Sequence, residues 1–222
     1  MKRVQEILFV LSVLTACTAT QTPGVPTQIA PLTTITPPAD STLPAPTKSI
    51  ELATVPPPND DFFTQMGIAL PAPACSGLTP AQTEGPYYIP NTPERTSLLE
   101  DGMQSTRLTL VGYVLDQNCQ PLSNALLDFW QADAQGEYDN SAYRLRGHQF
   151  TDAQGRYYLE TILPGIYSSR PIRHIHVMVQ PEGGGVVTSQ LYFSEQPIEG
   201  LTVTTEQRGE YLLGYFSFVV QR

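Results

Sequence analysis

The chain has 222 residues, of which 41% are hydrophobic and 15% are charged, and its formal net charge is −9 at pH 7. This acidic balance argues against nucleic acid as a partner, because binding phosphate requires clustered cations. Outside the N-terminus no apolar run approaches the ~18 residues of a membrane span. No glycine-rich phosphate-binding motif is present either, so a nucleotide-driven enzyme is not expected.

The first residues have the layout of an export signal. Two basic residues precede an apolar stretch over residues 7–14, which ends in small residues. The Leu-Thr-Ala-Cys sequence ending at Cys17 resembles a bacterial lipobox, which implies removal of residues 1–16 and lipidation of the Cys17 thiol. We therefore expect an exported lipoprotein of the bacterial cell envelope, anchored by lipid and facing the periplasm or the surface. An ordinary signal peptide cut nearby is the alternative.

Residues 17–72 are expected to form a tether. Ten prolines and ten threonines lie among the 43 residues 18–60, with only four charged side chains. Such a segment buries too little apolar surface to offset the entropy of ordering it. Its proline content favours a semi-rigid spacer. A short helical turn is expected near residues 62–68, before a folded domain over residues 73–222.

The folded domain is predicted to be all-β. Short runs rich in Val, Leu, Tyr and Thr alternate with turn signals, and no long segment has a helical apolar period. The expected strands cover residues 107–115, 125–131, 156–162, 173–180, 186–193 and 211–220. Short strands separated by turns predict a sandwich or a barrel. Residues 196–222 are expected to close it as a strand pair, with turns at Gly209 and Gly214.

The cysteines allow one disulfide. The chain has three, Cys17, Cys75 and Cys119. If Cys17 carries lipid, the other two remain as an even pair, which an oxidising compartment can join. Two free buried thiols are the alternative, since the sequence does not give the separation of the Cα atoms.

Four side chains are candidates for a metal site. His174 and His176 lie in one predicted strand, where residues two apart face the same side. Two neutral imidazoles so placed form half of a metal site, although a solvated polar face is the alternative. Tyr138 and Tyr167 lie in turn-rich segments, and their hard phenolate oxygens would favour ferric iron over zinc. For a single tyrosine, a rim aromatic with a bonded hydroxyl is the alternative.

Ordered motifs extend this pattern over residues 75–195. They include Thr83-Glu84-Gly85-Pro86-Tyr87-Tyr88, Trp130-Gln131-Ala132-Asp133, Gly136-Glu137-Tyr138, Pro164-Gly165-Ile166-Tyr167, His174-Ile175-His176 and Ser189-Gln190-Leu191-Tyr192-Phe193. This series resembles the intradiol ring-cleavage dioxygenases of the protocatechuate and catechol type, and more closely their exported single-domain relatives. The resemblance implies an antiparallel β-sandwich of the transthyretin (prealbumin) type with long loops.

The resemblance also implies a cofactor and a reaction. A mononuclear non-haem Fe(III) would be held by Tyr138, Tyr167, His174 and His176. The substrates would be a small aromatic diol and O2, and the product of ring opening a muconate-type diacid. The acidic chain itself gives no reason to expect nucleic acid among its partners, and its oligomeric state stays open.

Three further residues are expected near the substrate. Gln190 matches the family's glutamine. The family's arginine, three residues before the first histidine, is replaced here by Pro171, so Arg170 or Arg173 would have to take its role. Arg170 is favoured because Arg173, on a regular strand, faces away from both histidines. Tyr87 either lines the substrate pocket or braces the entry loop.

Two other interpretations of the function remain. Residues 110–167 also resemble transthyretin-like and carboxypeptidase-regulatory modules, which would make the chain a non-catalytic binding module on a cell-surface stalk. A zinc or copper site on the two histidines is the third reading, but it gives the tyrosines no role. Tyr138 together with His174 and His176 favours the enzyme, because a structural module has no need of them.

Overall fold

The computed structural model describes residues 60–222, so the expected signal peptide, Cys17 and most of the tether lie outside the described residues. The helix α1 (Asp60–Gln65) is followed by nine strands. They are β1 (Arg107–Leu115), β2 (Leu126–Trp130), β3 (Arg146–Phe150), β4 (Arg156–Ile162), β5 (His174–Gln180), β6 (Val187–Tyr192), β7 (Thr204–Arg208), β8 (Tyr211–Tyr215) and β9 (Phe218–Val219). None of the helices in this part of the chain is long and apolar enough to span a membrane.

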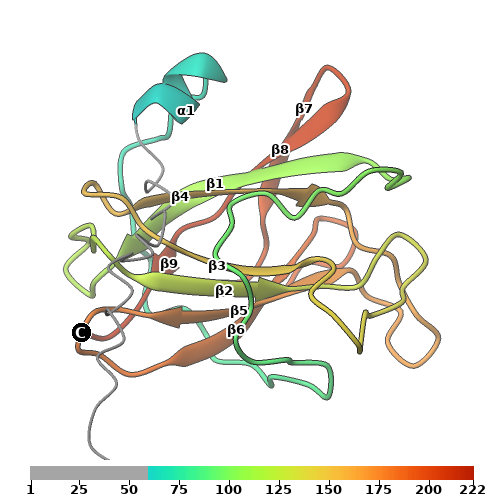
Figure 1. Cartoon of the computed structure of the whole chain (residues 1–222). Helices are drawn as coiled ribbons and strands as arrows, with labels where there is room; N and C mark the ends of the chain where they lie inside the picture. Colours follow the sequence, from blue (N-terminus) through green and yellow to red (C-terminus); the bar gives the residue numbers. More distant parts are fainter. Residues whose placement is uncertain (1–59) are drawn as a thin grey trace, which may run out of the picture. The chain divides into compact units, whose positions relative to one another are not determined.

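The strands form two sheets that lie as layers (Figure 1). One has the order β4-β1-β8-β7, with β9 beside β1, and the other has the order β3-β2-β5-β6. Between them Leu110 and Leu159 from the first sheet pack in one cluster with Phe129 and Val177 from the second, and all four are fully buried. The predicted all-β sandwich is therefore confirmed, and the barrel alternative is wrong.

The first sheet is mixed, which corrects the expected antiparallel sandwich in this sheet. β1 is antiparallel to β4 but parallel to β8 and β9. The second sheet is antiparallel throughout. The alternation of apolar residues determines which face of a strand is buried, but it carries no information on the direction of its neighbour.

The C-terminal region differs from the prediction in detail. The single strand expected over residues 211–220 is divided into β8 and β9, because Phe216 crosses closely over Gly112 of β1. A Cβ atom at Gly112 would overlap the carbonyl oxygen of Phe216. Gly209 lies at the turn of the β7–β8 hairpin with a positive φ of 57°, as expected, whereas Gly214 lies inside β8.

One strand was not predicted from the sequence. The residues of β3, RGHQF, lack the alternation of apolar side chains on which strand prediction depends. This strand lies at the end of a sheet, where only one neighbouring strand is needed. The strand pair expected over residues 196–222 is present as β7 and β8.

The folded domain begins earlier than residue 73. The expected helical turn is present as α1, and Phe63 and Ile68 are buried in a second cluster with Val111 of β1 and Leu213 of β8. The ring of Phe62 stacks on the ring of Tyr158 at a centroid distance of 3.4 Å. The segment expected to be the end of the tether therefore covers the outer face of the first sheet.

One irregular segment, residues 79–98, wraps around the second sheet (Figure 1). The amide of Gln82 donates to Thr188 of β6 at 2.9 Å, and the amide of Arg95 donates to His148 of β3 at 2.8 Å. Because β6 and β3 are the two edges of that sheet, the chain between them crosses its outer face. This crossing brings residues 83–88 over β5, the strand that carries both His174 and His176.

Candidate metal centre

The histidines of β5 face away from the sandwich core. His174 and His176 are each 2% exposed, while Ile175 and Val177 between and after them are fully buried in the core cluster. The centroids of the two imidazoles are 4.8 Å apart. The predicted same-face pair is therefore present, and it lies on the outer face of the second sheet beneath residues 83–88.

The two candidate tyrosines lie on different loops that fit together through glycines. Tyr138 follows β2 and Tyr167 follows β4. A Cβ atom at Gly136 would overlap the carbonyl of Ile166, and a Cβ atom at Gly165 would overlap the carbonyl of Ala134. The glycines two residues before each tyrosine thus let the loops touch, which places the tyrosine rings 6.1 Å apart.

The four side chains converge on one place. The hydroxyl oxygen of Tyr138 is 3.3 Å from Nε2 of His174. The ring of Tyr167 lies 6.0 Å from that of His174, and the ring of Tyr138 lies 6.3 Å from that of His176. Two phenols and two imidazoles, which the sequence spreads over about forty residues, therefore form a single cluster.

Hydrogen bonding leaves the His174 ring free to act as a ligand. Its Nδ1 lies 2.8 Å from the carbonyl oxygen of Ile172, and since a carbonyl only accepts, Nδ1 carries the proton. The lone pair is then on Nε2, which points at Tyr138. Burial lowers the pKa of His174 to about 4, so the ring is neutral at physiological pH.

His176 is neutral for the same reason. Burial lowers the pKa of His176 to about 2, and the next cause is the repulsion that a protonated His174 would exert on a protonated His176. Its Nδ1 is buried without a hydrogen-bond partner among the described residues. The imidazole stacks on Trp130 at 4.9 Å and 12°, so an aromatic plane fixes its orientation. A buried nitrogen without a partner is the kind of atom that a metal ion or a water would satisfy.

The Tyr138 phenol needs a cation before it can ionise. Burial raises the pKa of Tyr138 well above its ordinary value, and the neighbouring Tyr167 raises it further. Within residues 60–222 no three His, Cys, Asp or Glu side chains gather as a metal site, and the side chains that accompany the two histidines here are the two tyrosines. Two hard oxygens and two neutral nitrogens fit ferric iron better than zinc or copper.

The arginines on either side of Pro171 have opposite placements. The guanidinium of Arg170 donates to the side-chain oxygen of Gln190 and, at 2.9 Å, to the hydroxyl of Tyr192. Its charge also acts on both histidines. Arg173 points away, because it donates to the carbonyl of Pro164 and lies 3.5 Å from a carboxylate oxygen of Glu195. The structure thus brings Arg170 to the cluster and leaves Arg173 outside it.

Residues 79–98, called the covering segment below, lie over the four candidate ligands. The ring of Tyr87 stacks on Tyr138 at 4.3 Å and 13°, and it meets Tyr167 edge-on at 6.4 Å. A Cβ atom at Gly85 would lie 3.3 Å from Cε1 of His176. The buried amide of Gln190 donates to the carbonyl of Thr83 at 2.7 Å, so Gln190 joins the covering segment to Arg170.

Three residues of the site were not identified from the sequence. Trp130 is fully buried, and its ring lies against His176 rather than in the core cluster between the sheets. Tyr192 faces His174 across β5 and β6, which its spacing of two from Gln190 indicates. Arg146 contacts the Tyr138 loop from β3, and no pattern in the sequence points to it.

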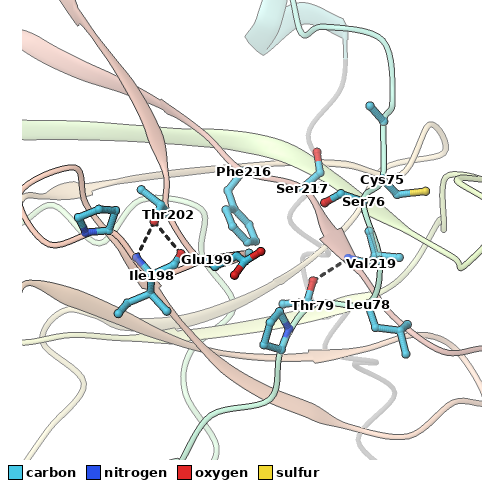
Figure 2. Close-up of a pocket in the computed structure, with 15 residues that line it drawn as sticks. Cys75, Ser76, Leu78, Thr79, Ile198, Glu199, Thr202, Phe216, Ser217 and Val219 are labelled. Carbon is cyan, nitrogen blue, oxygen red and sulfur yellow. Dashed lines mark hydrogen bonds between the residues drawn. The ribbon is translucent and has the colours of Figure 1, made fainter.

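A separate cavity lies elsewhere in the domain. It has a volume of about 700 Å³ and is lined by residues of the segments 74–80, 197–202 and 216–219, with Thr202 and Phe216 across from Leu78 (Figure 2). None of the four candidate ligands lines it. Cys75 at its rim is joined to Cys119 by a disulfide, with the Cα atoms 5.7 Å apart, so the structure forms the pair that the cysteine count allowed.

Comparison with protein families gives one match. A family model described as Dioxygenase matches residues 83–208, which is more than half of the chain. That range contains all four candidate ligands, Arg170 and Gln190.

Two characterised relatives are similar in sequence. Catechol 1,2-dioxygenase of Acinetobacter baylyi is 29% identical over 148 residues, which cover 54% of this chain and 47% of the relative. The protocatechuate 3,4-dioxygenase beta chain of Burkholderia cepacia is 33% identical over 110 residues, covering 41% of this chain and 46% of that one. The chain spans about half the length of the curated relatives it matches.

Solved structures extend the similarity to the fold. The dioxygenase domain of a dioxygenase carbohydrate-binding protein fusion from Streptomyces sp. SirexAA-E has a TM-score of 0.63 and 44% identity, covering 65% of this chain and 98% of that domain. A 3-chlorocatechol 1,2-dioxygenase from Rhodococcus opacus 1CP has a TM-score of 0.59 and 28% identity, with coverage of 64% and 72%.

Proposed function

The chain belongs to the intradiol ring-cleavage dioxygenase family, and from that membership we propose that it is an Fe(III)-dependent enzyme that opens a catechol-type ring between its two hydroxyl-bearing carbons. Both atoms of O2 enter the product, a muconate-type diacid. The observation that carries this proposal is the convergence of Tyr138, Tyr167, His174 and His176 on one buried place.

The four side chains would hold the metal. His174 is ready for this, because its proton is held on Nδ1 by Ile172 and its Nε2 lone pair faces Tyr138. Bound ferric iron would supply Lewis acidity and the charge that holds phenolates at neutral pH. Tyr138 and Tyr167 would give up their phenol protons to act as ligands, so metal binding is expected to liberate protons.

Arg170 would stabilise negative charge on the ring as it reacts with O2. A guanidinium fixed in advance acts on developing charge without having to reorganise. Here Gln190 and Tyr192 both accept from Arg170, and the amide of Gln190 is anchored in turn on Thr83. Gln190 would therefore position the arginine and close the site beneath the covering segment.

The substrate class follows from the relatives. Their names specify catechol, chlorocatechol, protocatechuate and hydroxyquinol dioxygenases. These rings share two adjacent hydroxyl groups and differ in their other substituents. A catechol-type ring is therefore proposed as the substrate of this chain, with Tyr87 against one face of it.

The chain is also proposed to be an exported lipoprotein. This proposal rests on the Leu-Thr-Ala-Cys sequence ending at Cys17 and on the proline-rich residues that follow it. The disulfide between Cys75 and Cys119 supports it, because such bonds persist in oxidising compartments.

A visible absorption spectrum of the purified protein after Fe(III) loading tests the proposed function. We expect about one iron per chain and a broad visible band from tyrosinate-to-iron charge transfer, which shifts when catechol is added without O2. Tyr138→Phe should weaken and shift the band. Tyr113→Phe, which alters a partly exposed tyrosine of β1, is the matched control and should leave it unchanged.

Protein that stays colourless after iron loading contradicts the proposal. The chain would then be better described as a non-catalytic β-sandwich binding module. If the band appears, oxygen uptake with a panel of catechols identifies the preferred ring.

A further inference from the structure

Arg146 is a buried cation that the proposed chemistry does not use. It lies at the start of β3, is 1% exposed, and is one of the largest fully buried side chains. Burial lowers the pKa of Arg146, but a guanidinium stays charged in proteins. Because a buried charge is costly unless it is bonded, its contacts indicate what it is for.

Those contacts are backbone carbonyls on two separate segments. Nη1 donates to the carbonyl oxygen of Tyr87 at 2.6 Å. Nη2 and Nε donate to the carbonyl oxygen of Asp139 at 2.6 and 3.2 Å. Tyr87 belongs to the covering segment, and Asp139 directly follows Tyr138. One guanidinium therefore links the main chain on both sides of the stacked Tyr87 and Tyr138 rings.

The groups around Arg146 are held by bonds of their own. The carboxylate of Asp139 accepts from the amides of Ser141, Ala142 and Arg144, so it shapes its own loop and only its carbonyl faces Arg146. The guanidinium carbon is 6.0 Å from the centre of the Tyr138 ring, and Nε of Arg95 donates to the carbonyl of Arg146 at 2.9 Å. Both the side chain and the main chain of Arg146 are therefore fixed by hydrogen bonds.

We propose that Arg146 is a positioning residue of the metal centre, which locks Tyr87 and Tyr138 together so that the Tyr138 hydroxyl stays beside His174. The link between the segments stands on the contacts alone, while its effect on iron rests on the proposed function. A lysine could not replace it, because a single ammonium group lacks the planar fork that reaches two carbonyls at once.

Hydrogen–deuterium exchange of the metal-free protein tests the link. Arg146→Met should speed exchange in residues 82–95 and in residues 135–144 together, by about tenfold or more, the factor expected for losing a hydrogen bond to a charged group. Arg146→Lys, which keeps the charge and is the milder change, should loosen at least one of the two segments. Exchange in β1 and β8 should not change.

Two control variants separate this effect from general destabilisation. Tyr157→Phe removes a buried hydrogen bond to Phe216 on the other sheet, and Arg208→Met removes an exposed charge on the β7–β8 hairpin. Neither should alter exchange in the two linked segments. Unchanged exchange in either segment of Arg146→Met, or equal acceleration throughout the domain, overturns the proposal.

Iron titration then tests the positioning role. Arg146→Met should bind Fe(III) about 10- to 100-fold more weakly than the parent, the range for residues that orient metal ligands, with a shifted visible band. Parental affinity and an unshifted band would reduce Arg146 to a structural residue and overturn the proposal. If the parent itself binds no iron, the proposed function fails, and the exchange data alone decide whether Arg146 links the two segments.

Discussion

At the scale of single residues, the centre depends on imidazoles that stay neutral inside the protein. His174 keeps its proton on Nδ1 through the carbonyl of Ile172, and His176 lies flat against Trp130. Both rings are withheld from water, which favours the uncharged form that binds metal.

Metal-free protein is therefore expected to lose stability in acid. Burial lowers the pKa of His174 to about 4 and that of His176 to about 2, whereas both rings titrate near ~6.5 in the unfolded chain. Below about pH 6.5 the unfolded state takes up protons that the folded state does not, so stability falls toward about pH 4 and is level above about pH 6.5. For His174 alone the loss is about 3 kcal/mol.

Urea unfolding of metal-free protein in steps from about pH 7 to about pH 4 measures this effect. His174→Gln should flatten the slope. A parental profile that does not change over that range would mean that these rings are not buried in the metal-free fold.

The two arginines beside Pro171 give a second test at this scale. Arg170→Ala should lower kcat by about 10²- to 10³-fold, the usual effect of removing one group that stabilises developing charge. Arg173→Ala should leave kcat close to the parental value, because Arg173 bonds Pro164 and Glu195 outside the cluster. Steady-state kinetics with catechol compare them, and the opposite ranking would assign the role to Arg173.

At the scale of elements, the site depends on two loops that touch through glycines. Gly136 and Gly165 each occupy a position where a Cβ atom would overlap the backbone of the other loop. The amide of Gly165 and the amide of Gly136 both donate to the carbonyl of Asp133, at 2.7 and 3.1 Å. Tyr138 and Tyr167 follow these glycines by two residues, so the loop contact determines how far apart the phenols lie.

Gly165→Ala should therefore separate the loops. We expect Fe(III) binding to fall by about tenfold or more, as for other changes around metal ligands, together with a weaker visible band. Gly185→Ala is the control, because nothing lies within 4 Å of a Cβ atom at this glycine and its φ is not positive. Iron titration followed by absorbance measures both variants, and parental binding by Gly165→Ala would show that the loops tolerate the extra methyl group.

At the scale of the whole molecule, one segment completes both the fold and the site. Residues 79–98 bond to the edges of the second sheet at β6 and β3 and continue to β4, where the amide of Leu98 donates to Glu160 at 2.8 Å. Exposed sheet edges invite pairing with other chains. The same crossing that covers these edges also brings Tyr87 onto Tyr138.

The proposed lipid anchor gives a prediction at the same scale. In bacteria that process lipoproteins, the full-length chain should fractionate with membranes, and Cys17→Ser should move it to the soluble fraction, because the removed thiol is the proposed attachment site for lipid. Detergent-phase partitioning with immunodetection measures this. Parental protein that is already soluble would contradict the anchor and favour an ordinary signal peptide.

The sequence by itself determined the features that depend on local geometry. Alternation along a strand was enough to place His174 and His176 on one face, and turn residues were enough to delimit β1 and β4. The types of the four candidate ligands and their ordered motifs were enough to indicate the family.

Only the tertiary structure decided which distant residues meet. Three contacts join segments far apart in the chain: the parallel pairing of β1 with β8, the contact between the two tyrosine loops and the link that Arg146 makes between Tyr87 and Asp139. Such contacts depend on how loops close over packed sheets. A pattern of neighbouring residues records which face a side chain takes, but not what approaches that face from elsewhere in the chain.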